Sequence, residues 1–346
     1  MVCGEARLPL FFVGIHWMTD SFGFLVVTFI IILAFEAVNG WTDAPNSIAT
    51  VVSTRVLAPM TAVAMASFFN LVGALTGTAV ATTIGKGLVD QELVGLDTIA
   101  AAAAAVIIWS TAAWYFGLPT SESHGIVSGL AGAAVATAGV DVLQADGWRK
   151  VFEGLGLAVV AGFLGGFLIM VVVLWLFQRV APALVRRLFA VLQVISSAFM
   201  AFSHGTADGQ KAMGVMALAI AVYEKKPPEE FAVPLWIILL AASTMAVSTG
   251  LGGWRIIRTL GMKVTHLDTP QGFSAEAAAA TTITISAHFG IPLSTTHTIG
   301  SAIMGVGATR RLSAVRWGVA YNIVGAWVLT FPACFGLGWL IAWLIP

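Results

Sequence analysis

Acidic and amide side chains interrupt an apolar stretch near the amino terminus, residues 35–54 (FEAVNGWTDAPNSIATVVST). A carboxylate at the centre of a bilayer is costly, so it marks a functional site by default. Asp43 and Asn46 stand three residues apart and share one face of a helix. Their oxygens suit a hard monovalent cation. We therefore predict Asp43, Asn46 and Asn39 as cation ligands and Glu36 as a member of the surrounding polar network.

A looser copy of this stretch, residues 200–214 (MAFSHGTADGQKAMG), follows at an offset of 165 residues and aligns Asp208 with Asp43. In the first copy Gly40, which follows an asparagine, and Pro45 predict a helix that is broken at membrane depth. We expect a similar acidic break in the second copy. Asp43 and Asp208 are then the predicted metal ligands, if the cation is sodium.

Two further segments share a Pro-Ser-His pattern: residues 116–128 (FGLPTSESHGIVS) match residues 289–301 (FGIPLSTTHTIGS) at an offset of 173. Each proline stands where a helix would begin, and the free N–H groups and the dipole at a helix start favour an anion. The hydroxyls that follow would complete an anion cradle. The alternative is that they donate to the carbonyl of residue i−4. The predicted anion ligands are Ser121, Ser123, Ser294, Thr295 and Thr296.

Other titratable side chains lie in the same segments. Lys211 stands three residues after Asp208, and because an unpaired ammonium is costly in a membrane it either pairs with Asp208 or binds the anion. We favour the ion pair and keep Lys211 as a candidate ligand of the anion. His124 and His297 occupy matching positions and either donate to the anion, relay protons or pack. Glu276 lies in an apolar run and joins the network candidates.

An anion and carboxylates placed this close together would repel each other unless cations lie between them. Cation binding at Asp43 and Asp208 would therefore raise the affinity for the anion, and the anion would raise the affinity for the cation by the same factor. The pattern thus predicts coupled transport of a cation and an anion, with no cofactor beyond Na⁺ or H⁺.

The composition predicts the setting of these residues. Of the 346 residues, 58% are hydrophobic and 10% are charged, and the mean hydropathy is +0.92, which is typical of a polytopic membrane protein. The 17 basic residues balance the 17 acidic residues, which argues against a nucleic-acid partner. Cys3 and Cys334 have neither metal-ligand nor redox spacing.

The repeats predict the architecture. We expect an all-α polytopic membrane protein of two inverted-topology repeats with broken helices and re-entrant hairpins, in about 10–12 membrane segments. Segments 119–140 and 291–309 are either short spans or hairpin arms. The predicted divisions are an N-terminal interfacial segment (1–21), a first repeat (22–177), a basic cytoplasmic linker (178–187) and a second repeat (188–346).

Basic loops predict the orientation, since cytoplasmic loops carry the excess of Lys and Arg. Loops 178–187, 253–268 and 310–316 and the loop with Arg55 are then cytoplasmic, and both termini are extracellular or periplasmic. The loops diluted by acidic residues, such as the one with Lys225, lie outside. The expected location is the cell membrane. A homodimer is one assembly that the sequence leaves open.

At these residues the chain resembles the inorganic phosphate transporter (PiT) family. The segments that carry the resemblance are, in chain order, NGWTDAPNSIATVVSTR, GLPTSESHG, FSHGTADGQKAMG, GFSAEAAAA and GIPLSTTHTIGSAIMGVG, which follow the family's order between about residues 24 and 325. The resemblance implies a cation-coupled phosphate permease with inverted repeats, cations at the aspartates and phosphate at the hairpin tips. Two positions depart from the family pattern. Ala207 replaces an asparagine, and Glu122 replaces a serine and adds a candidate proton carrier.

Three alternatives remain open at this point. A sulfate permease would keep the architecture and change the oxyanion. An intramembrane phosphatase or transferase would use His124 or His297 with a carboxylate, although two mirrored motifs disfavour one active site. A passive channel would show no uptake against a gradient. The preferred hypothesis is phosphate import by symport, with inorganic phosphate, the coupling cation and the lipid bilayer as partners.

Overall fold

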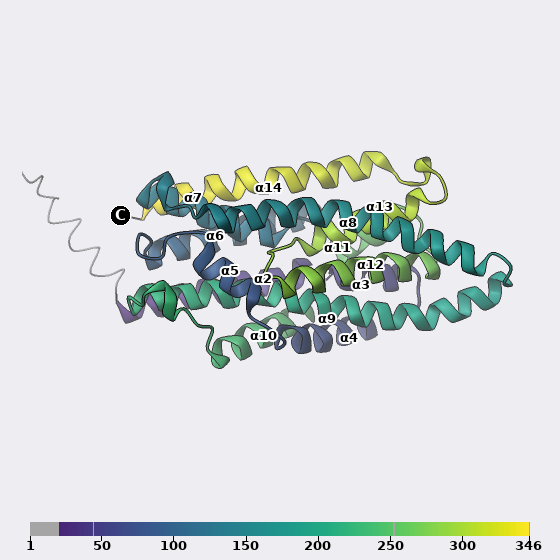
Figure 1. The fold of residues 1–346 in the computed structure, drawn as a ribbon, viewed down its shortest axis with the longest axis horizontal. Coiled ribbons are helices and arrows are strands. Elements are labelled where there is room, and N and C mark those ends of the chain that lie inside the picture. Colours follow the sequence, from purple (N-terminus) through teal and green to yellow (C-terminus); the bar gives the residue numbers. More distant parts are fainter. Residues whose placement is uncertain (1–20, 44, 252, 346) are drawn as a thin grey trace, which may run out of the picture.

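The computed structural model describes residues 21–43, 45–251 and 253–345, and these form a bundle of helices elongated along one axis (Figure 1). The predicted N-terminal segment 1–21 lies outside the described residues except for Ser21. The helices of the first half are α2 (Phe22–Asp43), α3 (Pro45–Ser53), α4 (Pro59–Ala74), α5 (Ala79–Gly87), α6 (Leu96–Phe116), α7 (Glu122–Ala138) and α8 (Ala145–Phe177). Those of the second half are α9 (Pro182–Tyr223), α10 (Leu235–Thr249), α11 (Trp254–Arg258), α12 (Thr269–His288), α13 (Thr295–Ala308) and α14 (Trp317–Leu344). Short 3₁₀ turns are η1 (Val140–Val142), η2 (Pro228–Glu230) and η4 (Leu312–Ala314), and η3 (Thr259–Lys263) is a π-helical turn.

In the part of the chain that the structure describes, five helical segments are long and apolar enough to cross a membrane: Phe22–Ser53, α6, α8, α9 and α14. The number rises to seven if each of two bent pairs is one span. These pairs are α4 with α5, bent by 67°, and α10 with Trp254–Lys263, bent by 62°. The remaining segments α7, α12 and α13 do not meet the same criteria. The chain is therefore an all-helical, multi-pass membrane protein, and the predicted 10–12 segments are reached only if these three arms are counted.

The break predicted at Gly40 and the break predicted in the second copy are both absent, whereas the break predicted at Pro45 adjoins Ala44, which lies outside the described residues. Gly40 lies inside α2, and the whole second copy, 200–214, lies inside the 42-residue helix α9. The glycines serve close helix packing instead. A Cβ on Gly40 would lie 1.9 Å from the Ser248 hydroxyl, and one on Gly205 would lie 2.1 Å from the Asn70 carbonyl oxygen. Small residues at such contacts let membrane helices approach each other, which outweighs the low helix propensity of glycine.

The helices α6 and α7 form one hairpin and α12 and α13 form another, and the two enter from opposite ends of the bundle. The outer ends of the first hairpin lie together: the N–H of Asp90, which precedes α6, donates to the carbonyl of Val142, which follows α7, at 2.8 Å. At the outer ends of the second hairpin, Arg310 pairs with Asp268. The tips meet in the interior, where the Ser123 hydroxyl donates to the Leu293 carbonyl at 3.1 Å. Segments 119–140 and 291–309 thus contain hairpin arms.

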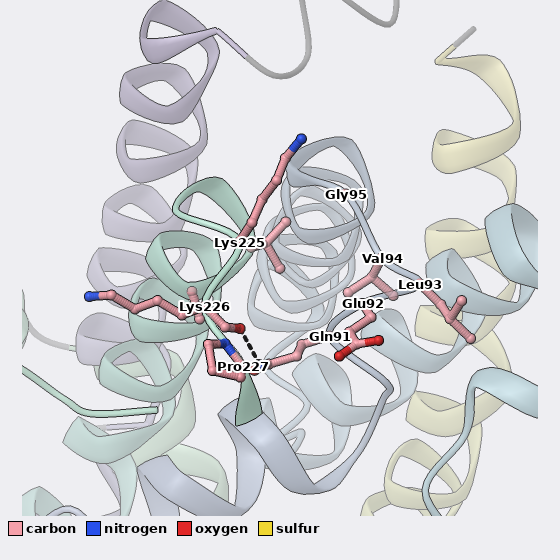
Figure 2. Close-up of a pocket in the computed structure, with 10 residues that line it drawn as sticks. Gln91, Glu92, Leu93, Val94, Gly95, Lys225, Lys226 and Pro227 are labelled. Carbon is pink, nitrogen blue, oxygen red and sulfur yellow. Dashed lines mark hydrogen bonds between the residues drawn. The ribbon is translucent and has the colours of Figure 1, made fainter. Parts of the chain in front are cut away.

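The two ends of the bundle carry different basic residues. A cavity at one end is lined by Arg55, Arg186 and Arg316, and each of these residues belongs to a different loop that was predicted to be cytoplasmic. The opposite end carries a pocket of about 590 Å³ next to Lys225 and Lys226. In Figure 2 these two ammonium groups point away from each other, while the Gln91 amide donates to the Lys226 carbonyl at 2.8 Å. The predicted grouping of loops therefore agrees with the bundle, and the side that faces the cytoplasm stays a prediction.

The close contact at Gly205 can be tested by substitution. Gly205→Ala places a Cβ against the α4 backbone and should lower the thermal midpoint of the purified protein, because overpacking costs about 1–3 kcal/mol. Gly156→Ala is the matched control, since Gly156 lies on the exposed side of α8 with no atom near its added Cβ. Both changes raise helix propensity equally. Equal midpoints for the two variants would contradict the packing role.

Candidate functional site

The first cluster joins the end of α2 and the start of α3 to the start of α13. The Thr296 hydroxyl donates to Asp43 Oδ1 at 2.6 Å. The Asn46 amide donates to the same carboxylate oxygen at 2.7 Å and to Thr296 Oγ1 at 2.8 Å. All three side chains are buried. The tip of the second hairpin is thus bonded directly to the acidic segment of the first half.

The second cluster lies on α9 around Asp208. The Thr295 hydroxyl donates to Asp208 Oδ2 at 3.0 Å, and His204 Nε2 lies 3.2 Å from the same oxygen. Lys211 Nζ lies 2.8 Å from Asp208 Oδ1, so the favoured ion pair is present. Thr295 and Thr296 are adjacent in the sequence. One helix start therefore supplies a hydroxyl to each of the two aspartates.

The two clusters form one site. Lys211 Nζ also lies 4.0 Å from Asp43 Oδ2. Asp43, His204 and Asp208 each offer an oxygen or nitrogen atom, and these atoms all lie within 4.8 Å of one another. Because opposite charges close together offset the cost of burial, the lysine between the aspartates stabilises both in the interior. The structure therefore brings together residues that stand more than 150 positions apart in the sequence.

The hydroxyls of the hairpin tips take several roles. Ser121 and Ser294 cap their helices, accepting hydrogen bonds from the backbone N–H of His124 and His297 at 3.3 and 3.2 Å. A capping hydroxyl still has its own proton to donate. The alternative of donation to the carbonyl of residue i−4 occurs at the neighbouring Thr298. The start of α13 thus lies beside both aspartates, and the start of α7 meets it through the hydrogen bond from Ser123 to the Leu293 carbonyl. Two helix starts that meet in this way can form an anion cradle.

The predicted network carboxyls each have buried partners that sequence reasoning missed. Glu122 accepts a hydrogen bond from the Thr42 hydroxyl at 2.6 Å. Glu276 accepts hydrogen bonds from Thr50 and Ser196. Thr42 precedes the aspartate of the first motif, and Thr50 lies four residues after its asparagine. Helical spacing could therefore have indicated Thr50, whereas nothing in the sequence connects Ser196 to this network.

Glu36 and Asn39 form a pair of their own within α2. The Asn39 amide donates to Glu36 Oε2 at 3.2 Å. The side-chain amide oxygen of Asn39, Oδ1, has no hydrogen-bond partner among residues 21–43, 45–251 and 253–345. Asn39 thus binds the network carboxyl and still has an acceptor to offer.

The two predicted histidines pack against each other where the hairpin tips meet. The rings of His124 and His297 lie 4.6 Å apart between centroids, and His297 lies 4.1 Å from the Trp327 ring of α14. Trp327 Nε1 donates to the Pro119 carbonyl at 3.1 Å. Within the described part of the chain no ring nitrogen of either histidine has a hydrogen-bond partner. Packing between the hairpins is therefore their observed role.

Two amide side chains that were not among the predicted ligands position the site. Gln210, next to Lys211 on α9, accepts hydrogen bonds from the backbone N–H groups of Val80 and Ala81 at 2.8 and 3.2 Å. It therefore holds the start of α5 against α9. Asn70 Oδ1 lies 3.0 Å from His204 Nδ1 and so orients the ring that faces Asp208. Glutamine directly before Lys211 was a visible signal for the first of these.

Buried acceptor oxygens are concentrated on the first-half side of the site. Asp43 Oδ2 and Asn46 Oδ1 have no hydrogen-bond partner among the residues that the structure describes. Unpartnered buried oxygens of a carboxylate and an amide are the donor set that a monovalent cation takes from a protein. The residues present therefore fit a cation at Asp43 and Asn46.

The hydrogen bond between the hairpin tip and Asp43 should contribute to stability. Thr296→Val removes the hydroxyl at nearly constant shape and leaves Asp43 and Asn46 each without one partner, which costs about 1–3 kcal/mol. Thr298→Val is the matched control on the same helix, because its hydroxyl only supplements a backbone hydrogen bond to Ser294. Thermal unfolding in detergent should show the larger loss for Thr296→Val, and a larger loss at Thr298 would refute the assignment.

Comparison with known proteins covers almost the whole chain. The model of the phosphate transporter family matches residues 39–338. A probable low-affinity inorganic phosphate transporter of Rhizobium meliloti is 43% identical over 316 residues, which cover 91% of this chain and 94% of the relative. A protein with the same name from Bacillus subtilis is 38% identical over 319 residues, covering 91% and 96% of the two chains. These names agree with the expectation that the chain is not an enzyme.

The fold has a counterpart among solved structures. The structure named the sodium-dependent phosphate transporter superposes with a TM-score of 0.84 at 23% identity, covering 92% of this chain and 98% of the other. This likeness confirms the all-helical membrane fold. The family match over residues 39–338 and the relatives above 30% identity lead to one conclusion. The chain belongs to the phosphate transporter family.

Proposed function

We propose that this protein imports inorganic phosphate by symport with a monovalent cation, at the site where the hairpin tips meet the two aspartates. The observation that carries the proposal is the hydrogen-bonded group of Asp43, Asn46 and Thr296, in which a cation ligand set touches the helix start that would hold the anion. The family match supports phosphate as the anion.

The geometry favours coupling between the two ligands. The cation would be held by the free oxygens of Asp43 and Asn46, and the phosphate by Ser121, Ser123, Ser294 and the helix-start N–H groups. Without the cation, the carboxylates repel the phosphate strongly, because the charges lie close together in an interior of low dielectric constant. Cation and phosphate therefore raise each other's affinity, which is the thermodynamic requirement of symport.

The opposed hairpins support alternating access. Each hairpin enters from its own end of the bundle, and the contact between Ser123 and Leu293 closes the space between the tips. We infer that separation of one tip at a time opens the site to one side of the membrane. Transporters with inverted repeats place their site between such elements and expose it to each side in turn.

Two cations remain candidates for the coupling ion. The carboxylate and amide oxygens of Asp43 and Asn46 suit Na⁺, and the solved structure of similar fold is named as sodium-dependent. The buried carboxyls of Glu36 and Glu122 would equally serve a proton. Uptake of labelled phosphate into proteoliposomes under a sodium gradient alone and a proton gradient alone separates the two. Accumulation above the external concentration would also exclude a passive channel.

Asp43 is the residue on which the cation role depends. Asp43→Asn keeps the shape of the side chain and removes the negative charge, so gradient-driven phosphate uptake in proteoliposomes should fall to the background of empty vesicles. Asp146→Asn, at an exposed aspartate in the first turn of α8, is the control and should transport normally. Normal gradient-driven phosphate uptake by Asp43→Asn would contradict the proposed role of Asp43 in cation binding.

Glu122 should set the choice between phosphate and sulfate. Its Oε1 accepts from Thr42, and its Oε2 has no hydrogen-bond partner in the described residues. A carboxylate accepts a hydrogen bond from protonated phosphate, whereas sulfate has no proton to give. Excess sulfate should therefore compete weakly with phosphate uptake by the wild type.

Glu122→Gln replaces one acceptor by a donor and should strengthen competition by sulfate about tenfold, since one hydrogen bond to a charged group is worth about 1.5–3 kcal/mol. The readout is the sulfate concentration that halves phosphate uptake. Unchanged competition in the variant would assign the selectivity to other residues, and strong competition in the wild type would favour the sulfate alternative.

A further inference from the structure

The two acidic helices carry different side chains at equivalent positions. Asn46 follows Asp43 by three residues, and Lys211 follows Asp208 by three residues at the same offset of 165. An amide offers an acceptor oxygen to a cation, whereas an ammonium only donates and is itself a cation. The first half thus supplies a cation ligand where the second half supplies a positive charge.

The ammonium of Lys211 lies where a second monovalent cation would be expected. Its Nζ is 2.8 Å from Asp208 Oδ1 and 4.0 Å from Asp43 Oδ2, and the side chain is 2% exposed. The other oxygen of Asp208 is engaged by Thr295 and His204. Both oxygens of Asp208 are therefore neutralised or bonded by groups of the protein itself.

Asp43 differs from Asp208 in this respect. Only its Oδ1 is hydrogen-bonded, by Thr296 and Asn46, and its Oδ2 has no such partner in the part of the chain that the structure describes. Asn46 Oδ1 is buried and equally unpartnered there. Asp208 Oδ1 also lacks a hydrogen-bond partner there, but the Lys211 ammonium lies 2.8 Å from it, compared with 4.0 Å from Asp43 Oδ2. Room for a mobile cation is therefore greater on the first-half side of the site.

The charges of the acidic pairs lead to the same result. Within these two pairs, two aspartates and one lysine have a formal charge of −1, whereas asparagine at both equivalent positions would leave −2. Glu122, which interacts with Asp43, adds the same charge in both cases, so the lysine lowers the number of cations needed by one. We propose that Lys211 is a tethered cation that replaces one mobile coupling ion, so that one cation, held by Asp43 and Asn46, accompanies each phosphate. This assignment rests on the proposed symport and makes Lys211 a determinant of its stoichiometry.

The stoichiometry is measured from the phosphate accumulation that a cation gradient sustains. Purified protein in proteoliposomes is held at zero membrane potential with a tenfold gradient of the driving cation, and labelled phosphate is followed until net flux stops. One cation per phosphate supports about tenfold accumulation and two support about a hundredfold, because each tenfold ratio stores the same free energy. Where protons drive uptake, the ratio is calculated for a single ionised form of phosphate.

The wild type should stop at about tenfold accumulation. Lys211→Asn recreates the pairing of Asp43 with Asn46 on α9 and should raise the limit to about a hundredfold by admitting a second cation. Lys211→Arg is the control, because it keeps a tethered charge and should stay at about tenfold. A hundredfold limit in the wild type, or a tenfold limit in a transporting Lys211→Asn protein, would overturn the proposal.

If Lys211→Asn does not transport, the wild type and Lys211→Arg still test the proposal. A limiting phosphate accumulation of about tenfold in these two proteins supports it, and about a hundredfold contradicts it. Failure of the tethered-cation role is distinct from failure of symport. Wild-type protein that accumulates phosphate with two cations refutes only the role of Lys211. Wild-type protein that shows no gradient-driven accumulation refutes the symport itself, and the role of Lys211 with it.

Discussion

Charge burial is the constraint on which the rest of this structure depends. Asp43 and Asp208 lie in the interior of a bundle that is surrounded by lipid, where an uncompensated carboxylate is expensive. Lys211 lies between them, and Thr295 and Thr296 supply one hydroxyl to each. These contacts require α2, α9 and α13 to meet at one depth, and this meeting fixes where the second hairpin must end.

The packing of small residues makes that meeting possible. Gly205 brings α9 against α4, and Gly129 brings α7 to α6, where its added Cβ would lie 3.1 Å from the Ala102 carbonyl. Hairpins that approach from opposite ends can then touch at their tips. The same contacts that satisfy the buried polar groups would have to separate for a substrate to pass. The contacts at the hairpin tips therefore affect both the stability of the fold and the rate of transport.

The composition and the repeated motifs were sufficient to predict the membrane fold and to single out candidate residues that the structure brings together. Few structural roles place carboxylates and prolines inside apolar runs. Their recurrence at fixed offsets reduced the number of these roles further. The breaks at Gly40 and in 200–214 were predicted wrongly, because glycine in a membrane helix serves either bending or close contact. Only the neighbouring helix distinguishes the two, and here α10 and α4 contact these glycines.

The sequence by itself determined which residue types are candidates for the chemistry: two aspartates, an asparagine, a lysine and the tip hydroxyls. The tertiary structure decided which partner each of them has. It paired Lys211 with Asp208 while leaving Oδ2 of Asp43 without a hydrogen-bond partner among the described residues, and it connected Glu276 to Ser196 on α9. The physical reason is that a buried polar group must be satisfied by whatever lies beside it. Those neighbours are set by the packing of helices that are distant in the sequence.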